Sequence, residues 1–359
     1  ATQPMRIAFI NSTHRWGGVK TWMLDVGQAL SERGHAVTLY GRRGPFVDAW
    51  TAAGLPGRSV TFGSDFSPRS IGFFVRDFRA WTPDLILANV GKDLRTAGIA
   101  ATLCGIPIIH RVGLPGDMRD KWNVRLVHRF LKPSYLVPCE FIKNGLLREL
   151  PFLSPEAVTS VHTGKTPVAV PPGQVADPLR LVISSQLSKE KGHSDLFQAL
   201  ARLRGQHRFV CHILGTGPFE NQLQDLASEL GLDHHLIWHG FQPDVRPFLR
   251  QADIFLLPSY REGLPNTLLE AMAEGLIPLS RNVGGVQEVW PDSLAPFLLP
   301  EDSDPATWAA ALSDLLVQPE NQLLRYKAAS WQACTENFTL ATQISRLEAW
   351  LQGQRAPRS

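Results

Sequence analysis

Two glutamates eight residues apart, Glu262 and Glu270, follow an apolar run in the second half of the chain. Pro265 suits a first helical position and Asn266 or Thr267 suits a cap, so a helix is predicted to start there. Glu262 then lies in the loop before the helix, and Glu270 about one turn inside it. Ionised carboxylates are strong hydrogen-bond acceptors, so one can hold sugar hydroxyls and the other a ribose diol. On the spacing alone, two solvated glutamates are the favoured interpretation.

A lysine in the same half of the chain has the position and charge to bind a diphosphate. Lys191 lies in the segment 188–192, directly after a predicted strand over 181–185. A lysine at the carboxyl end of a strand can neutralise a diphosphate leaving group as a point charge. An ordinary solvated helix start is the alternative interpretation.

Glycines at strand-to-helix junctions are candidates for a close approach of backbone to phosphate. Gly17 and Gly18 follow the first predicted strand and open the first helix, and Gly215 and Gly217 occupy a similar junction in the second half. A helix N-terminus offers free N–H groups and the positive end of its dipole to an anion. Plain tight turns remain the alternative, and the absence of G-x-G-x-x-G argues against a nicotinamide dinucleotide fold.

The elements that must position these residues form two alternating series of strands and helices. The first series has strands predicted at 6–11, 36–40, 84–88, 106–109, 136–138 and 157–161. A proline-rich stretch, 165–178, is the best linker candidate. The second series has strands predicted at 181–185, 209–214, 236–239, 254–258 and 277–280. The predicted fold class is α/β, with two doubly wound parallel-sheet domains facing across a cleft, and ligands bound outside the carboxyl ends of the strands.

Taken together, these segments resemble the family-4 retaining glycosyltransferases of the GT-B fold. The family's two-glutamate signature is matched by Glu262 and Glu270 within EGLPNTLLEAMAEGLIPLSRNVGGVQEV, and Lys191-Gly192 is similar to its diphosphate-binding Lys-Gly. LGTGP resembles the family's strand-end turn and HGFQPDV its base-proximal loop, while Gly17-Gly18 is similar to its N-terminal glycine loop. The likeness is strong over 181–290 and loose over 5–165.

The resemblance implies a Rossmann-like acceptor domain over 1–168, a nucleotide-sugar domain over 169–335, and a helix over 336–359 that packs back on the first domain. Glu262 would contact donor sugar hydroxyls, Glu270 the ribose, and Lys191 the diphosphate. Catalytic roles are expected for Glu262, Lys191 and His110, with UDP- or GDP-sugar as the donor and without a metal or cofactor. The remaining residues expected at the donor are Gly17, Gly18, Gln186, Gly215, Gly217, Phe241, Gly263, Leu264, Pro265 and Asn266.

Two positions depart from the family pattern. Gln186 stands where the family usually has an arginine, so either Lys189 compensates or the diphosphate is clamped more weakly. The family's histidine after the strand at 106–109 is missing at its usual place, and His110 is the candidate that takes its role. A histidine at a strand end is also often structural.

The near-neutral net charge of +3 hides an asymmetry between the halves of the chain. Residues 1–170 have nine more basic than acidic residues, and the remainder has six more acidic than basic residues. A predicted helix within 118–132 carries basic residues at helical spacing beside a stripe of Trp122, Leu126 and Phe130. Arg111, Arg119, Lys121, Arg125 and Arg129 are therefore candidates for an acceptor or membrane face on an anionic lipid or glycolipid. The alternative is a surface helix whose aromatic stripe faces the core.

Composition narrows the class of protein further. No apolar run approaches the roughly 18 residues that span a bilayer, no signal peptide is visible, and the four cysteines are scattered singly. The expectation is a cytoplasmic enzyme, peripheral at the inner face of the cytoplasmic membrane, with no nucleic-acid partner. The predicted activity is that of a retaining hexosyltransferase acting on a lipid-linked, lipopolysaccharide or other cell-envelope glycan. A nucleotide-sugar epimerase and a catalytically silent binding partner are the alternatives.

Overall fold

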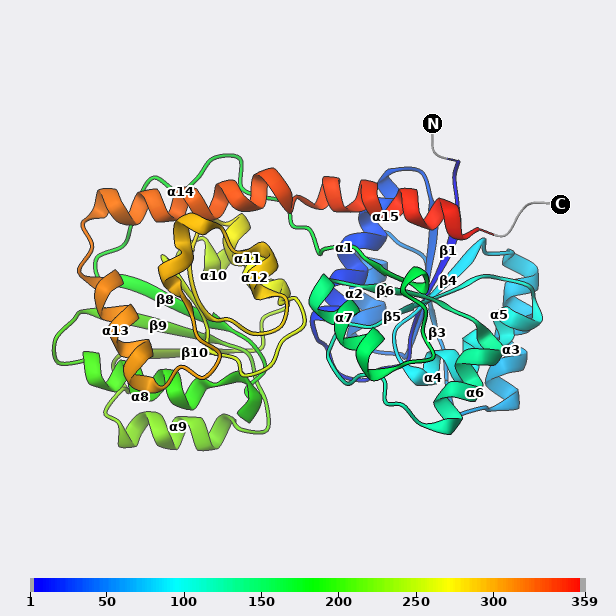
Figure 1. The fold of residues 1–359 in the computed structure, drawn as a ribbon, viewed down its shortest axis with the longest axis horizontal. Helices are drawn as coiled ribbons and strands as arrows, with labels where there is room; N and C mark the ends of the chain where they lie inside the picture. The colour runs from blue at the N-terminus through cyan, green and yellow to red at the C-terminus, as the bar shows by residue number, and fades with distance from the viewer. Residues whose placement is uncertain (1–2, 356–359) are drawn as a thin grey trace. The chain divides into compact units, whose positions relative to one another are not determined.

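A computed structural model of the chain describes residues 3–355 and divides into two compact units (Figure 1). Unit 1 runs to Thr163 and resumes at Leu340, and unit 2 comprises Gly164–Thr339. These limits lie close to the predicted boundaries at 168/169 and 335/336. Among the described residues, no helix combines the length and apolar character needed to cross a bilayer.

Within its described residues, unit 1 is built on one parallel sheet with the strand order β3-β2-β1-β4-β5-β6-β7. Alternate residues of β1 point into different cores: Ile7 and Phe9 pack with α1, α2 and α15, whereas Ala8 and Ile10 pack with α3 and α5. Such a doubly covered sheet explains why its strands read as continuous apolar runs. In chain order the elements are β1 (Arg6–Asn11), α1 (Gly18–Glu32), β2 (Ala36–Gly41), α2 (Pro45–Ala52), β3 (Gly57–Ser59), α3 (Pro68–Trp81), β4 (Leu85–Ala88), α4 (Gly91–Asp93), a π-helix (Leu94–Gly98), α5 (Ile99–Leu103), β5 (Ile108–Arg111), α6 (Trp122–Leu131), β6 (Ser134–Val137), α7 (Glu140–Glu149), a 3₁₀ turn (Pro155–Ala157), β7 (Val158–Ser160) and α15 (Leu340–Gln354).

Within residues 164–339, unit 2 has a second parallel sheet, with the order β10-β9-β8-β11-β12-β13. Its core joins residues of the central strands to α8, α9 and α13, including the fully buried Phe197 and Trp308. The elements are β8 (Leu179–Ser184), a 3₁₀ turn (Lys189–Lys191), α8 (His193–Leu203), β9 (Phe209–Leu214), α9 (Glu220–Glu229), β10 (Leu236–Gly240), α10 (Arg246–Leu249), β11 (Ile254–Leu257), α11 (Asn266–Ala273), β12 (Ile277–Arg281), α12 (Val286–Val289), a 3₁₀ segment (Asp292–Phe297), β13 (Leu298–Leu299), α13 (Pro305–Leu316) and α14 (Glu320–Asn337).

The last two helices belong to different units. Helix α14 packs on α11 within unit 2, whereas α15 packs on α1 in unit 1. Ile344, Leu347 and Leu351 of α15 are buried in the same core as β1 and α1. The C-terminal helix therefore completes the N-terminal unit.

Candidate active site

A lysine–glutamate ion pair lies at the carboxyl ends of two neighbouring strands of unit 2. Lys191 ends the turn that follows β8, and Glu262 lies in the loop between β11 and α11. Because β8 and β11 are adjacent in the sheet, these two loops meet at one edge. Lys191 Nζ lies 2.6 Å from Glu262 Oε1, and only 8% of the glutamate side chain is exposed. The structure thus brings together two of the residues predicted for catalysis.

Gly192 fixes the direction of the chain directly after Lys191. It caps α8 with φ of +71°, and a Cβ at this position would overlap the carbonyl oxygen of Pro258. Only glycine combines this left-handed conformation with so close an approach of two backbones. The loop that carries Lys191 is therefore pressed against the loop that carries Glu262.

Glu270 is also paired with a lysine, Lys165, which lies in the predicted linker. Lys165 Nζ lies 3.0 Å from Glu270 Oε1, and about a tenth of each side chain is exposed. The backbone N–H of Lys165 donates to the carbonyl of Phe338, beside a β-bridge to Thr339. Lys165 thus lies where the chain passes from unit 1 into unit 2, beside Thr339, where the chain leaves unit 2 again. In the sequence, the only feature that could have pointed to Lys165 was its positive charge within a proline-rich segment.

A second residue missed from the sequence is Arg281, the last residue of β12. Its guanidinium is buried and donates to Asp195 at 2.5 Å, and also to the carbonyl oxygens of Ser303 and Pro258. The ring of Tyr260 lies 4.3 Å from the Arg281 guanidinium, and its hydroxyl donates to the same aspartate. This cluster ties the segment before Glu262 to α8. In the sequence, the feature that could have pointed to Arg281 was its position directly after the predicted apolar strand at 277–280.

The other predicted donor residues lie in loops after the strands of unit 2. Gln186 is exposed after β8, and Phe241 is half-exposed after β10. Gly217 follows β9, where a Cβ would overlap the carbonyl oxygen of Leu187. The remaining predicted residues are Gly215, directly after β9, and Gly263, Leu264, Pro265 and Asn266, which lead into α11. Pro265, rather than Asn266 or Thr267, is the N-cap of this helix.

In unit 1, Gly17 is the N-cap of α1, and Gly18 is its first residue. The φ of Gly17 is −167°, which any residue can adopt, and a Cβ there would meet no atom within 4 Å. Packing therefore does not require glycine at position 17. The missing side chain leaves open space at the start of α1, as a close-lying ligand would need.

His110 and Arg111, at the end of β5, are both buried. Burial, with a smaller effect of His128, lowers the pKa of His110 to about 3, so its ring is neutral near pH 7. A catalytic role for His110 stays a prediction. The Arg111 guanidinium lies 4.2 Å from the Trp22 ring, and burial lowers its pKa to about 10. Arg111 does not belong to an exposed basic face, because β5 places it inside the unit.

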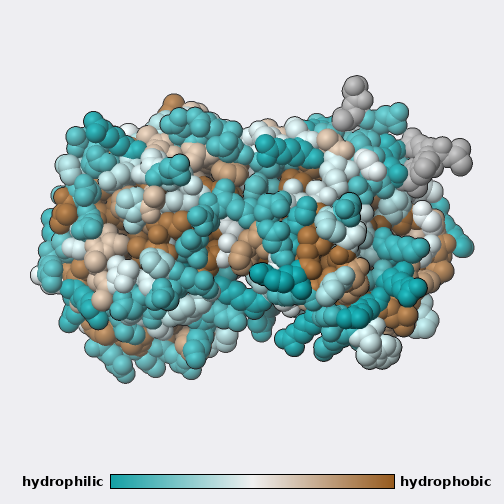
Figure 2. All heavy atoms as spheres, in the orientation of Figure 1, coloured by the Kyte–Doolittle hydropathy of each residue, from teal (hydrophilic) through white to brown (hydrophobic). Residues whose placement is uncertain are grey.

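The other four residues predicted for the basic face, Arg119, Lys121, Arg125 and Arg129, are exposed on or just before α6. The interpretation in which the aromatic stripe of this helix faces the core is wrong. Trp122, Leu126 and Phe130 are 78%, 60% and 58% exposed. In Figure 2, brown hydrophobic atoms appear at the surface beside teal ones where Figure 1 places α6.

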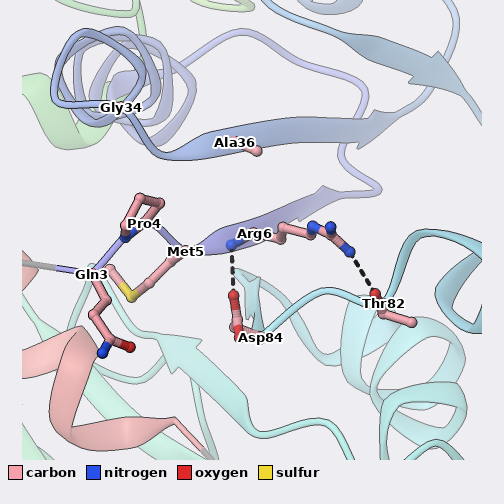
Figure 3. A pocket seen from close by; sticks show the side chains of 8 residues that line it. All are labelled: Gln3, Pro4, Met5, Arg6, Gly34, Ala36, Thr82 and Asp84. Atoms are coloured by element: carbon pink, nitrogen blue, oxygen red, sulfur yellow. Dashed lines mark hydrogen bonds between the residues drawn. The ribbon is translucent and has the colours of Figure 1, made fainter.

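A hollow of about 720 Å³ lies in unit 1 at the opposite, amino-terminal ends of the strands (Figure 3). Arg6 is one of the residues that line this hollow. Its backbone N–H donates to Asp84 and its guanidinium donates to Thr82. None of the residues predicted for donor binding or catalysis lines the hollow. It is therefore separate from the candidate site.

The two parallel-sheet units define the fold as GT-B. A solved structure of Anabaena Alr3699/HepE in complex with UDP and glucose superposes with a TM-score of 0.81 over 97% of this chain and 99% of that one, at 18% identity. At such low identity the likeness establishes the fold alone.

The sequence of unit 2 is similar to a known family. Residues 171–331 match the family described as Glycosyl transferases group 1. The putative colanic acid biosynthesis glycosyltransferase WcaL of Escherichia coli K12 is 32% identical over 169 residues, which cover 45% of this chain and 41% of WcaL. The lipopolysaccharide core biosynthesis glycosyltransferase LpsE of Rhizobium meliloti 1021 is 36% identical over 99 residues, 28% of each chain. The chain thus spans less than half the length of these curated relatives.

Proposed function

We propose that this protein is a retaining glycosyltransferase that moves a hexose from a nucleotide diphosphate sugar to a cell-envelope glycan or its lipid-linked precursor. The observation that carries the proposal is the Lys191–Glu262 pair at the carboxyl edge of the sheet in unit 2. Relatives named for colanic acid and lipopolysaccharide core biosynthesis support the class of acceptor, and the HepE complex with UDP and glucose supports a uridine diphosphate sugar as the donor.

The proposed roles of the side chains follow from their charges and positions. Lys191 would leave Glu262 for the donor diphosphate, assisted by the N-terminus of α8. Glu262, released from the lysine, would accept hydrogen bonds from the sugar hydroxyls. Glu270 would hold the ribose diol, while Lys165 balances the negative charge of its carboxylate.

In the proposed reaction, the bond between the anomeric carbon and the diphosphate oxygen breaks, and its electron pair goes to that oxygen. The acceptor hydroxyl attacks the anomeric carbon from the same face, and its proton passes to the departing phosphate. The configuration is thereby retained, and no metal is required. Lys191 contributes by stabilising the negative charge that grows on the leaving group.

The proposal is tested by thermal unfolding and turnover with a panel of nucleotide sugars. One UDP- or GDP-sugar is expected to raise the Tm, since a ligand at about 100 times its Kd adds roughly 2.7 kcal/mol of stability. Lys191→Ala and Glu262→Ala are expected to lower turnover by about 100-fold or more. Glu190→Ala removes an exposed charge from the turn of Lys191 and serves as the control.

The alternatives give different outcomes in the same assay. If no nucleotide sugar stabilises the protein, the donor site is wrong. Conversion of the donor to its epimer without an acceptor would identify an epimerase, and donor binding without turnover by any acceptor tried would indicate a silent binding partner.

A further inference from the structure

Helix α6 exposes its apolar stripe to solvent, although an amphipathic helix normally buries that face. Trp122, Leu126 and Phe130 are spaced four residues apart and fall within roughly a quarter of the helix circumference. All three side chains are more than half exposed. The buried residues His128 and Leu131 lie on the other side of the helix, where Leu131 joins the core of unit 1. The helix is therefore anchored by one face and presents a second apolar face outward.

Cations lie beside this apolar stripe. Arg119, Lys121, Arg125, Arg129 and Lys132 are exposed, and Asp120 is the sole carboxylate in the segment 119–132. Asp120 is paired with Arg125, from which it accepts two hydrogen bonds of 2.5 Å. The other four cations form no ion pair with any described residue. His128 adds no charge near neutral pH, since burial lowers its pKa to about 4.

We propose that α6 docks this protein onto an anionic phospholipid surface, with Trp122, Leu126 and Phe130 entering the interface and the flanking cations meeting the lipid phosphates. An apolar stripe on a short helix with cations beside it fits the boundary between acyl chains and headgroups, where aromatic and leucine side chains insert and basic side chains contact phosphate. Four unpaired cations beside the stripe would be unfavourable against a neutral protein surface, but they complement a surface of negative charge. The surface is defined without reference to nucleotide-sugar chemistry, so it can be tested without any turnover.

The experiment is co-sedimentation of the full chain with vesicles, at about 0.15 M salt, comparing a phosphatidylglycerol–phosphatidylcholine mixture with phosphatidylcholine alone. Binding is expected to the anionic vesicles only, and to weaken as salt is raised. The triple variant W122S/L126S/F130S should reduce the partition coefficient by more than about tenfold. The double variant R129Q/K132Q should reduce it by roughly tenfold or more, since each cation near the surface contributes about a fivefold effect.

Two matched controls accompany these variants. Leu103→Ser and Val317→Ser remove side chains that are similarly exposed, 59% and 62%, from other elements. They should leave vesicle binding unchanged. The Tm of the triple variant should match that of the wild type, because its altered side chains are largely outside the core.

Absence of binding to anionic vesicles, or binding that the triple variant retains, would overturn the proposal. Concentration-dependent dimerisation that the triple variant abolishes, without vesicle binding, would assign the stripe to a second copy of the chain and would equally overturn it. Equal binding to both kinds of vesicle would contradict the role of the cations.

Discussion

Each signature carboxylate of unit 2 has its own lysine. Lys191 contacts Glu262, Lys165 contacts Glu270, and both glutamates are largely buried. A buried carboxylate that loses its cation is left with an unpaired charge, which is far more costly than the loss of a surface ion pair. Pairing therefore holds both carboxylates in place before a ligand arrives.

Lys165→Met is expected to weaken donor binding, because Glu270 would lose the cation that fixes its carboxylate. The KM for the donor should rise by about tenfold with a smaller change in kcat, since Lys165 is a positioning residue that need not touch the reacting atoms. Steady-state kinetics and the Kd of the free nucleoside diphosphate measure this effect.

Lys165→Arg should recover most of the affinity, and Arg202→Met, which removes an exposed cation from α8, is the charge control. An unchanged KM in Lys165→Met, in a protein with normal Tm, would show that Lys165 does not position Glu270.

The loops at the carboxyl ends of β8 and β9 are held together by their backbones. The N–H of Leu187 donates to the carbonyl of Thr216, and the N–H of Phe219 donates to the carbonyl of Leu187. Gly217 lies between these two bonds, where a side chain would overlap Leu187. The glycine motif after β9 therefore has a packing role in joining two site loops, whatever ligand it approaches.

Gly217→Ala is expected to destabilise the protein by about 1–3 kcal/mol, because the added methyl group must displace the backbone of Leu187. Chemical denaturation followed by tryptophan fluorescence provides the measurement. Gly205→Ala is the matched control, since a Cβ there meets no atom within 4 Å and its φ is not in the left-handed region. Equal stability of the two variants would mean that the junction relaxes freely around position 217.

The two units differ in whether one continuous segment of the chain forms them. Unit 2 is one continuous segment with its own core, whereas unit 1 combines the N-terminal part of the chain with α15. Helix α15 also contributes Glu348, which accepts a hydrogen bond from Arg33 and contacts the buried His35. A truncation after Thr163 would remove both this ion pair and three buried apolar side chains.

Residues 164–339 expressed alone should therefore fold and retain nucleotide binding. Residues 1–163 alone should be strongly destabilised, since each of Ile344, Leu347 and Leu351 contributes about 1.5–3 kcal/mol by its burial. Circular dichroism, thermal unfolding and nucleotide titration of the two fragments test this. Addition of a peptide spanning 338–355 should restore structure to the fragment 1–163. Cooperative folding of the fragment 1–163 by itself would contradict this assembly.

The sequence by itself predicted most strands along the chain, though not the short β3 and β13, together with the two-domain α/β organisation and the candidate residues Lys191, Glu262 and Glu270. Local sequence patterns predict those features, because apolar runs indicate strands and the residues that follow a strand lie at its carboxyl end. Only the tertiary structure showed that Lys165 and Arg281 support the site, because their partners are far away in the chain. Only the tertiary structure decided that His110 and Arg111 are buried and that the stripe of α6 is exposed. Periodicity determines which side chains share a face of a helix, but the surrounding elements determine which face they cover.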